Sequence, residues 1–136
     1  MKVLVDTAVW SLAFRRRRHV VESAEASQLV ELVLDSRVAI IGAIRQELLS
    51  GMKEHTQFEN VRERLRAFPD TEVTSADYEE AAAFFNRCRA KGVQGSNTDF
   101  LICAVAARNE FSIFTTDEDF VRFARILPIV LHGTHR

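Results

Sequence analysis

Four acidic residues lie where their side chains could do chemistry together: Asp6, Glu47, Asp99 and Asp117. Asp6 directly follows a short apolar run, Asp117 follows the expected strand 112–115 after one intervening residue, and Glu47 lies shortly after another apolar run. Asp99 opens an otherwise apolar segment. Taken singly, each acid is explained as a helix cap, a charge favoured by a helix dipole or a solvent-facing residue. Taken together they form a candidate site. Apolar runs of this kind are typical of buried parallel strands, and the carboxyl ends of such strands meet at one edge of the sheet.

Carboxylates gathered with little basic compensation repel one another unless a cation lies between them. Oxygen ligands without His or Cys suit Mg²⁺ or Mn²⁺ rather than zinc. Such an ion polarises a phosphodiester and lowers the pKa of a bound water, so a protein nucleophile is not required. The hydroxyls of Thr115 and Thr116 could orient a ligand carboxylate. Without metal, the crowding predicts that at least one of the four acids has a raised pKa.

The elements that must position these acids follow from hydrophobic periodicity and from turn signals. The expected strands are 3–5, 38–41, 112–115 and 129–131, with 71–74 as a further short one. The expected helices are 6–12, 20–35, 44–50, 58–68, 75–91, 99–108 and 118–125. Ser75 and either Asn97 or Thr98 are the expected caps of the two helices that begin near them. Strands that alternate with helices are typical of an α/β fold with a covered parallel sheet, where ligands bind beyond the carboxyl ends of the strands.

Length and composition fit one globular domain over residues 1–136. The chain is 47% hydrophobic and 27% charged, a balance that argues against disordered and low-complexity classes. The sequence has no apolar run of membrane-spanning length and no signal-peptide pattern, so a cytoplasmic protein without a membrane partner is expected. Cys88 and Cys103 lie in helical apolar patterns, which predicts two buried, reduced thiols.

A formal net charge of −1 gives the whole molecule no attraction to nucleic acid, so any such binding must use a local patch. The dense basic run is Arg15, Arg16, Arg17 and Arg18. It is either a solvated loop or a contact for RNA phosphates or for a protein partner.

Four short motifs, in order and together spanning nearly the whole chain, resemble those of the PIN-domain ribonucleases. They are Asp-Thr-Ala-Val-Trp at 6–10, Glu-Leu-Leu-Ser-Gly at 47–51, Thr-Asp-Phe-Leu-Ile-Cys-Ala-Val-Ala at 98–106 and Thr-Thr-Asp-Glu-Asp-Phe at 115–120. More narrowly, the chain resembles the VapC toxins of type II toxin–antitoxin pairs. Ala8 departs from the pattern, because the family more often has Ser or Asn at that position.

The resemblance implies a three-layer α/β/α sandwich with a central, mostly parallel sheet. It implies a Mg²⁺- or Mn²⁺-dependent endoribonuclease that hydrolyses RNA phosphodiesters with metal-activated water. The catalytic metal ligands would be Asp6, Glu47, Asp99 and Asp117, with Thr115 and Asp119 in supporting positions. The resemblance also implies a homodimer that is silenced by a cognate antitoxin, expected to bind DNA, in the active-site groove.

Two other classes of function are weighed against this one. A degenerate PIN fold could bind RNA or protein without catalysis, although the presence of all four acids argues against degeneracy. Phosphoryl transfer to a small molecule through the Asp117-x-Asp119 pair is the other class. That motif belongs after the first strand of a dehalogenase-like fold, whereas here it lies near the end of the chain.

Overall fold

The centre of the molecule is a three-stranded parallel sheet in the order β2-β1-β3. Its strands are β1 (Val3–Val5), β2 (Val38–Ala39) and β3 (Ser112–Phe114). The computed structural model describes residues 1–14 and 23–133, and all statements on the fold concern these residues. The first strand of the chain therefore lies in the middle, which explains why it is apolar at every position.

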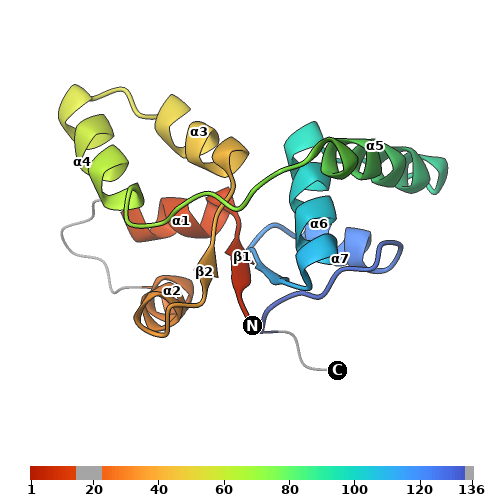
Figure 1. Cartoon of the computed structure of the whole chain (residues 1–136), viewed down its shortest axis with the longest axis horizontal. Helices are drawn as coiled ribbons and strands as arrows, with labels where there is room; N and C mark the ends of the chain where they lie inside the picture. Colours follow the sequence, from red (N-terminus) through yellow and green to blue (C-terminus); the bar gives the residue numbers. More distant parts are fainter. Residues whose placement is uncertain (15–22, 134–136) are drawn as a thin grey trace.

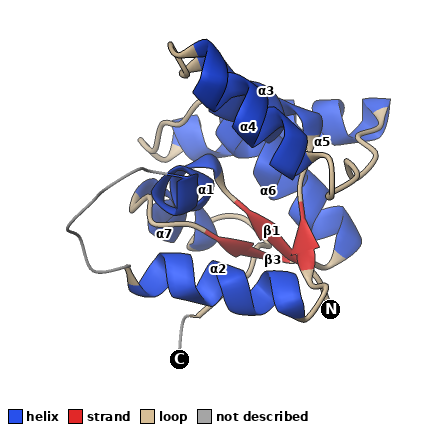
Figure 2. Cartoon of the chain, turned by 90° about the vertical axis from the view of Figure 1, so that its left-hand side faces the viewer, coloured by secondary structure: helices blue, strands red, loops and turns tan. Residues whose placement is uncertain are grey.

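Helices connect the strands and cover both faces of the sheet, which confirms the expected α/β/α arrangement. They are α1 (Thr7–Phe14), α2 (Ala24–Leu34), α3 (Gly42–Ser50), α4 (His55–Leu65), α5 (Ser75–Ala90), α6 (Asn97–Asn109) and α7 (Asp119–Ala124). Figure 1 shows α1 and α2 on one side of β1 and β2, and α6 and α7 on the other. In the view turned by 90°, α2 runs along one side of the strands while α3, α4 and α5 lie beyond the other (Figure 2).

The pairing of β1 and β3 ends at the first candidate acid. Val5 is opposite Phe114 in the ladder, and the backbone N–H of Asp6 donates to the Phe114 carbonyl at 2.9 Å. The next residue, Thr7, already belongs to α1. Asp6 therefore lies at the carboxyl edge of the central strand, where a parallel sheet presents its ligands.

The core explains why α6 is apolar over so much of its length. Its residues 100–106 are all buried, so this helix is surrounded by protein rather than amphipathic. Trp10 is buried as well and packs edge-on against Phe68, as expected for a core residue. Cys88 and Cys103 are free, buried thiols, which confirms that expectation.

Two of the predicted strands do not form as strands. The segment 129–131 pairs with the sheet only through a bridge between Leu131 and Ile113. The segment 71–74 is not a strand either, because the bridge to Ile40 is made by the preceding residue, Asp70. Thr74 instead caps α5, with its hydroxyl accepting from the Asp77 N–H at 3.2 Å.

The predicted helix caps were also displaced by one or two residues. Thr74 rather than Ser75 caps α5, and Ser96 rather than Asn97 or Thr98 caps α6. Both caps have extended backbone angles, and each belongs to a capping box whose third helical residue is an aspartate. The aspartate in the second box is Asp99, which gives this candidate acid a structural role as well.

A bidentate ion pair joins α5 to α6. Arg108 donates from Nε to Asp77 Oδ1 at 2.7 Å and from Nη2 to Asp77 Oδ2 at 2.8 Å. A third bond from Arg108 Nη2 reaches the Glu72 carbonyl at 3.0 Å. The beginning of α5 is thereby held against the end of α6.

Membrane-spanning helices and the basic run at 15–18 were two further subjects of the sequence analysis. Across residues 1–14 and 23–133, none of the helices has the length and apolarity needed to cross a membrane. The basic run of Arg15, Arg16, Arg17 and Arg18 lies outside the described residues, as do the first residues of the helix expected at 20–35.

Candidate active site

Asp6 and Asp117 are joined through one threonine hydroxyl at the carboxyl edge of the sheet. Thr115, directly after β3, donates from its hydroxyl to Asp6 Oδ2 at 2.8 Å. The same hydroxyl oxygen accepts the Asp117 backbone N–H at 2.9 Å. The hydroxyl expected to orient a carboxylate is therefore that of Thr115. Thr116 is exposed and makes no such bond within the described residues.

Glu47 reaches the same place from α3 through a second threonine. The hydroxyl of Thr7 donates to Glu47 Oε1 at 2.6 Å, and the Thr7 backbone N–H donates to Asp6 Oδ1 at 2.8 Å. Glu47 is exposed whereas Asp6 is buried, so the network runs from the surface down to the sheet. Three of the four acids thus belong to one hydrogen-bonded chain built on Thr7 and Thr115.

Asp99 is held at the first turn of α6 by its capping box. Its Oδ2 accepts the Ser96 backbone N–H at 3.0 Å, and its own N–H donates to the Ser96 hydroxyl at 3.1 Å. Asp99 is close enough to Asp6, Asp117 and Glu47 for their charges to influence one another. In Figure 1, α3 and α6 lie on opposite sides of the end of β1.

The electrostatics confirm that at least one of the four acids has a raised pKa, but burial rather than crowding is the main cause. Burial raises the pKa of Asp6 to about 6, against the opposing hydrogen bonds from Thr115 and Thr7, and the charges of Asp99 and Asp117 raise it further. Burial also raises the pKa of Asp99, and the charges of Asp117 and Glu47 act in the same direction. Buried carboxylates that repel each other favour protonation or the arrival of a cation.

The four acids fit a hard divalent cation by their chemistry. They offer carboxylate oxygens alone, which suits Mg²⁺ or Mn²⁺. In the part of the chain that the structure describes, however, no group of three or more His, Cys, Asp or Glu side chains is spaced to hold a metal ion. The four acids thus match a divalent cation in the chemistry of their oxygen donors but not in their spacing in this structure.

Asp119 and Ala8 occupy peripheral positions. The Asp119 carboxylate pairs with Arg122 at 2.5 Å, and its backbone N–H donates to Asp117 Oδ1 at 2.9 Å. Asp119 thus orients the fourth acid through its main chain rather than through its carboxylate. Ala8 lies half-buried in the first turn of α1 and has no polar group to add to the site.

Two residues of this network were not singled out by the sequence analysis. These residues are Thr7 and Ser96. The spacing Ser96-x-x-Asp99 is a capping-box pattern and could have identified Ser96. The bond from Thr7 to Glu47 joins residues 40 positions apart, so only the fold reveals it.

Comparison with known proteins gives a family match and a set of similar folds. The family model named PIN domain matches residues 3–126. The structure resembles VapBC2 from Rickettsia felis bound to a promoter DNA fragment, with TM-score 0.77 and 18% identity, covering 99% of this chain and 100% of that one. It also resembles FitAcB from Neisseria gonorrhoeae (TM-score 0.68, 20% identity, 98% and 99% covered). A toxin–antitoxin complex from Klebsiella pneumoniae has TM-score 0.64 and 23% identity, with 88% and 90% covered. Among curated proteins, none matches this chain in sequence.

Proposed function

Because this chain belongs to the PIN domain family, we propose that it is a metal-dependent endoribonuclease and the toxin of a type II toxin–antitoxin pair. The observation that carries the proposal is the set of carboxylates at the carboxyl edge of the sheet, where burial, with a smaller contribution from the neighbouring charges, raises the pKa of Asp6 to about 6. A site of this composition suits the hydrolysis of phosphodiesters in RNA.

The residues that would hold Mg²⁺ or Mn²⁺ are Asp6, Glu47, Asp99 and Asp117. Bound there, the ion would supply Lewis acidity for the scissile phosphate and for the attacking water, so that a P–O bond breaks by hydrolysis. Thr115 and Thr7 hold their carboxylates by bonds of 2.8 and 2.6 Å, which fixes the orientation of Asp6 and Glu47 before any ligand arrives. This preorganisation is the contribution of the threonines to catalysis.

The proposed partners are a cognate antitoxin, a second copy of the chain and the RNA substrate. The similar structures support an antitoxin, because they include a toxin–antitoxin complex from Klebsiella pneumoniae. The first of them is bound to a promoter DNA fragment, which supports a DNA-binding partner. Action on cellular RNA would place the protein in the cytoplasm.

Cleavage of an RNA pool by the purified chain tests this function. We expect cleavage with Mg²⁺ or Mn²⁺ and none after chelation. Asp99→Asn should lower the rate by about 100-fold or more. Asp35→Asn, which changes an exposed acid at the end of α2, is the matched control and should cleave at the wild-type rate. Cleavage that survives chelator, or that persists at full rate in Asp99→Asn, would contradict the proposal.

A second candidate is a PIN fold that binds RNA or protein without catalysis. The observation that favours it is the spacing of the acids, since no three of the described His, Cys, Asp or Glu residues are placed to hold an ion. Thermal unfolding with Mn²⁺ separates the two candidates. A site that binds metal only in the folded state must raise the Tm by mass action. An unchanged Tm up to millimolar Mn²⁺ would favour the binding module.

A further inference from the structure

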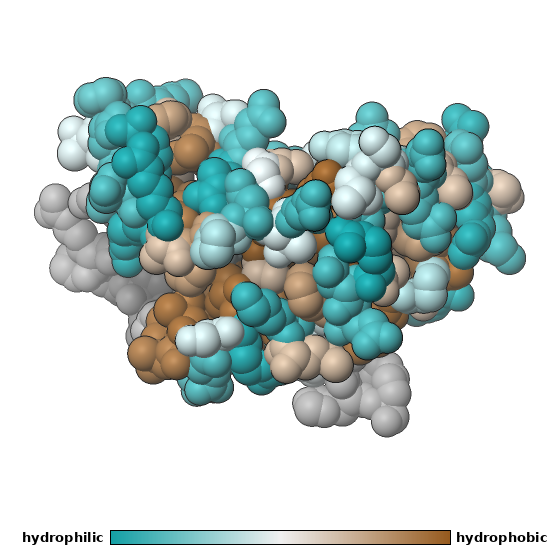
Figure 3. Space-filling model, viewed as in Figure 1, coloured by the Kyte–Doolittle hydropathy of each residue, from teal (hydrophilic) through white to brown (hydrophobic). Residues whose placement is uncertain are grey.

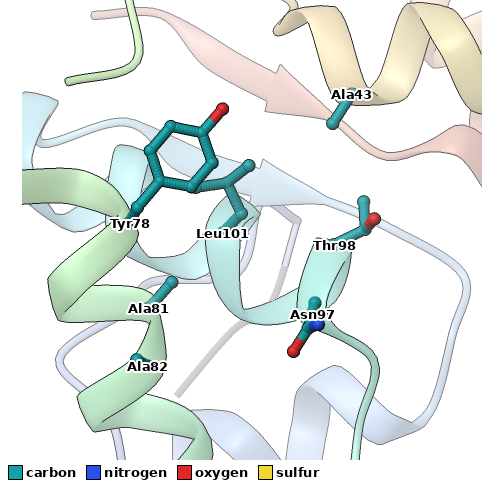
Figure 4. A pocket seen from close by; sticks show the side chains of 7 residues that line it. All are labelled: Ala43, Tyr78, Ala81, Ala82, Asn97, Thr98 and Leu101. Atoms are coloured by element: carbon teal, nitrogen blue, oxygen red, sulfur yellow. The ribbon is translucent and has the colours of Figure 1, made fainter. Parts of the chain in front are cut away.

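A cleft lies between α3, α5 and α6, and two of these helices, α3 and α6, carry Glu47 and Asp99. Its volume is about 440 Å³, and it is lined by Ala43, Tyr78, Ala81, Ala82, Asn97, Thr98 and Leu101. Tyr78 stands on one side, and Asn97 and Thr98 stand on the other (Figure 4). Three of the lining residues are alanines, whose small side chains leave the space open.

The cleft shares two helices with the candidate active site. Ala43 lies four residues before Glu47 on α3, so both are on the same face of that helix. Thr98 directly precedes Asp99 in the first turn of α6. In the space-filling view, a hollow separates the side that carries α3 and α4 from the side that carries α5 (Figure 3). A ligand in the cleft would therefore contact the same two helices that carry Glu47 and Asp99.

The lining combines one aromatic face with neutral polar groups. Tyr78 is 59% exposed and is the single tyrosine of the chain. Within the described residues, the side chains of Tyr78, Asn97 and Thr98 make no hydrogen bond, so their polar groups are available to a ligand. The lining includes no charged side chain. An aromatic face with free amide and hydroxyl groups is the chemistry that recognises a nucleobase.

We propose that this cleft binds one unstacked base of the RNA substrate, adjacent to the scissile phosphate. The ring of Tyr78 is the stacking surface, and Asn97 and Thr98 are the groups that meet the base edge. This inference rests on the proposed function. A peptide fits the lining less well, because the walls are helices that offer no strand edge and there is no charge to pair with a side chain.

The test measures binding of single-stranded RNA oligonucleotides that carry the fluorescent base 2-aminopurine at successive positions. The Asp99→Asn background prevents cleavage during the measurement. We expect quenching at one position only, and Tyr78→Ala should abolish the quenching and raise the Kd by about 10-fold or more. Tyr78→Phe keeps the ring and should stay within about twofold of the parent. Ala82→Leu should reproduce the loss by filling the cleft from an exposed position.

The matched control is Glu79→Ala, an exposed neighbour on α5 that does not line the cleft. Circular dichroism establishes that each variant is folded. Tyr78→Ala that binds and quenches like Glu79→Ala would overturn the base site. If the wild-type chain cleaves RNA and Tyr78→Ala, made in the cleaving chain, has the same KM, the base site alone fails. If the wild-type chain cleaves no RNA, the proposed function itself fails.

Discussion

Replacing Asp6 by Asn should stabilise the metal-free protein at alkaline pH. Asp6 is 6% exposed, accepts hydrogen bonds from the Thr7 N–H and the Thr115 hydroxyl, and lies close to the charges of Asp99 and Asp117. The substitution removes a buried charge but keeps the shape and one acceptor oxygen. Any loss of stability at pH 8 would mean that the hydrogen bonds outweigh burial and repulsion.

The magnitude follows from the pKa of Asp6. In the folded protein it is about 6, against an ordinary value of 3.8, and a difference of about 2 units corresponds to about 3 kcal/mol. Because the folded pKa is raised, the protonated form stabilises the fold fully below pH 3.8, and this contribution is lost as the pH rises through 6. The gain in Asp6→Asn at pH 8 should be about 1–3 kcal/mol, since one acceptor becomes a donor amide. This corresponds to a Tm higher by about 3–10 °C.

Urea denaturation of the wild type and Asp6→Asn at pH 8 and at pH 5, both with chelator, measures the effect. The difference in the free energy of unfolding between Asp6→Asn and the wild type should narrow by about half at pH 5, where the wild-type Asp6 carboxyl is largely protonated. Saturating Mn²⁺ should close or reverse the difference in stability between the two proteins, since a concentration of 100 times the Kd adds about 2.7 kcal/mol to the wild type alone. Asp35→Asn is the control and should show neither change. A pH-independent gap would refute the assignment of the raised pKa to Asp6.

The remaining predictions concern residues that support the site. Thr115→Val removes the hydroxyl that bridges two acids, and it should lower RNA cleavage by about 10-fold or more. Gly95→Ala places a Cβ 2.5 Å from Phe123 Cζ, so urea denaturation should show a loss of about 1–3 kcal/mol; unchanged stability would contradict the packing. Arg108→Met leaves Asp77 without the guanidinium that lowers its pKa, so the Tm should fall at pH 7. That deficit should shrink as the pH falls below 3.8, because the unfolded chain then binds a proton that folded wild-type Asp77 binds only at lower pH; a deficit that does not shrink would refute the ion pair.

The α/β order and the edge position of the first acid could be predicted from sequence because strong local signals coincide there. Val3, Leu4 and Val5 are apolar in succession and are all fully buried, as a central parallel strand requires. Asp6 ends that run and meets Phe114 of β3. The rule that ligands lie beyond the carboxyl ends of parallel strands then places its side chain.

The segments that sequence analysis misplaced have weak local signals. Residues 129–131 are apolar, yet Val130 is 66% exposed and only Leu131 bridges to the sheet, because this segment lies at the edge. The choice of Ser96 as the α6 cap, among several adjacent polar residues, depends on its extended backbone angles. Hydrophobic periodicity predicts neither the edge position of a segment nor the choice of a cap among adjacent polar residues, because both depend on tertiary contacts.

A carboxylate cluster that repels itself can persist in a folded protein only if other groups offset the repulsion. Three of the acids each accept a backbone N–H beside the start of a helix: Asp6 from Thr7, Asp99 from Ser96 and Asp117 from Asp119. Backbone N–H groups at helix starts lack intrahelical partners and carry the positive end of the dipole. The same positions that made each acid look like an ordinary cap therefore hold the charges in place. Glu47 lies within α3 and relies on the Thr7 hydroxyl instead, which is why it is the acid whose placement depends most on the fold.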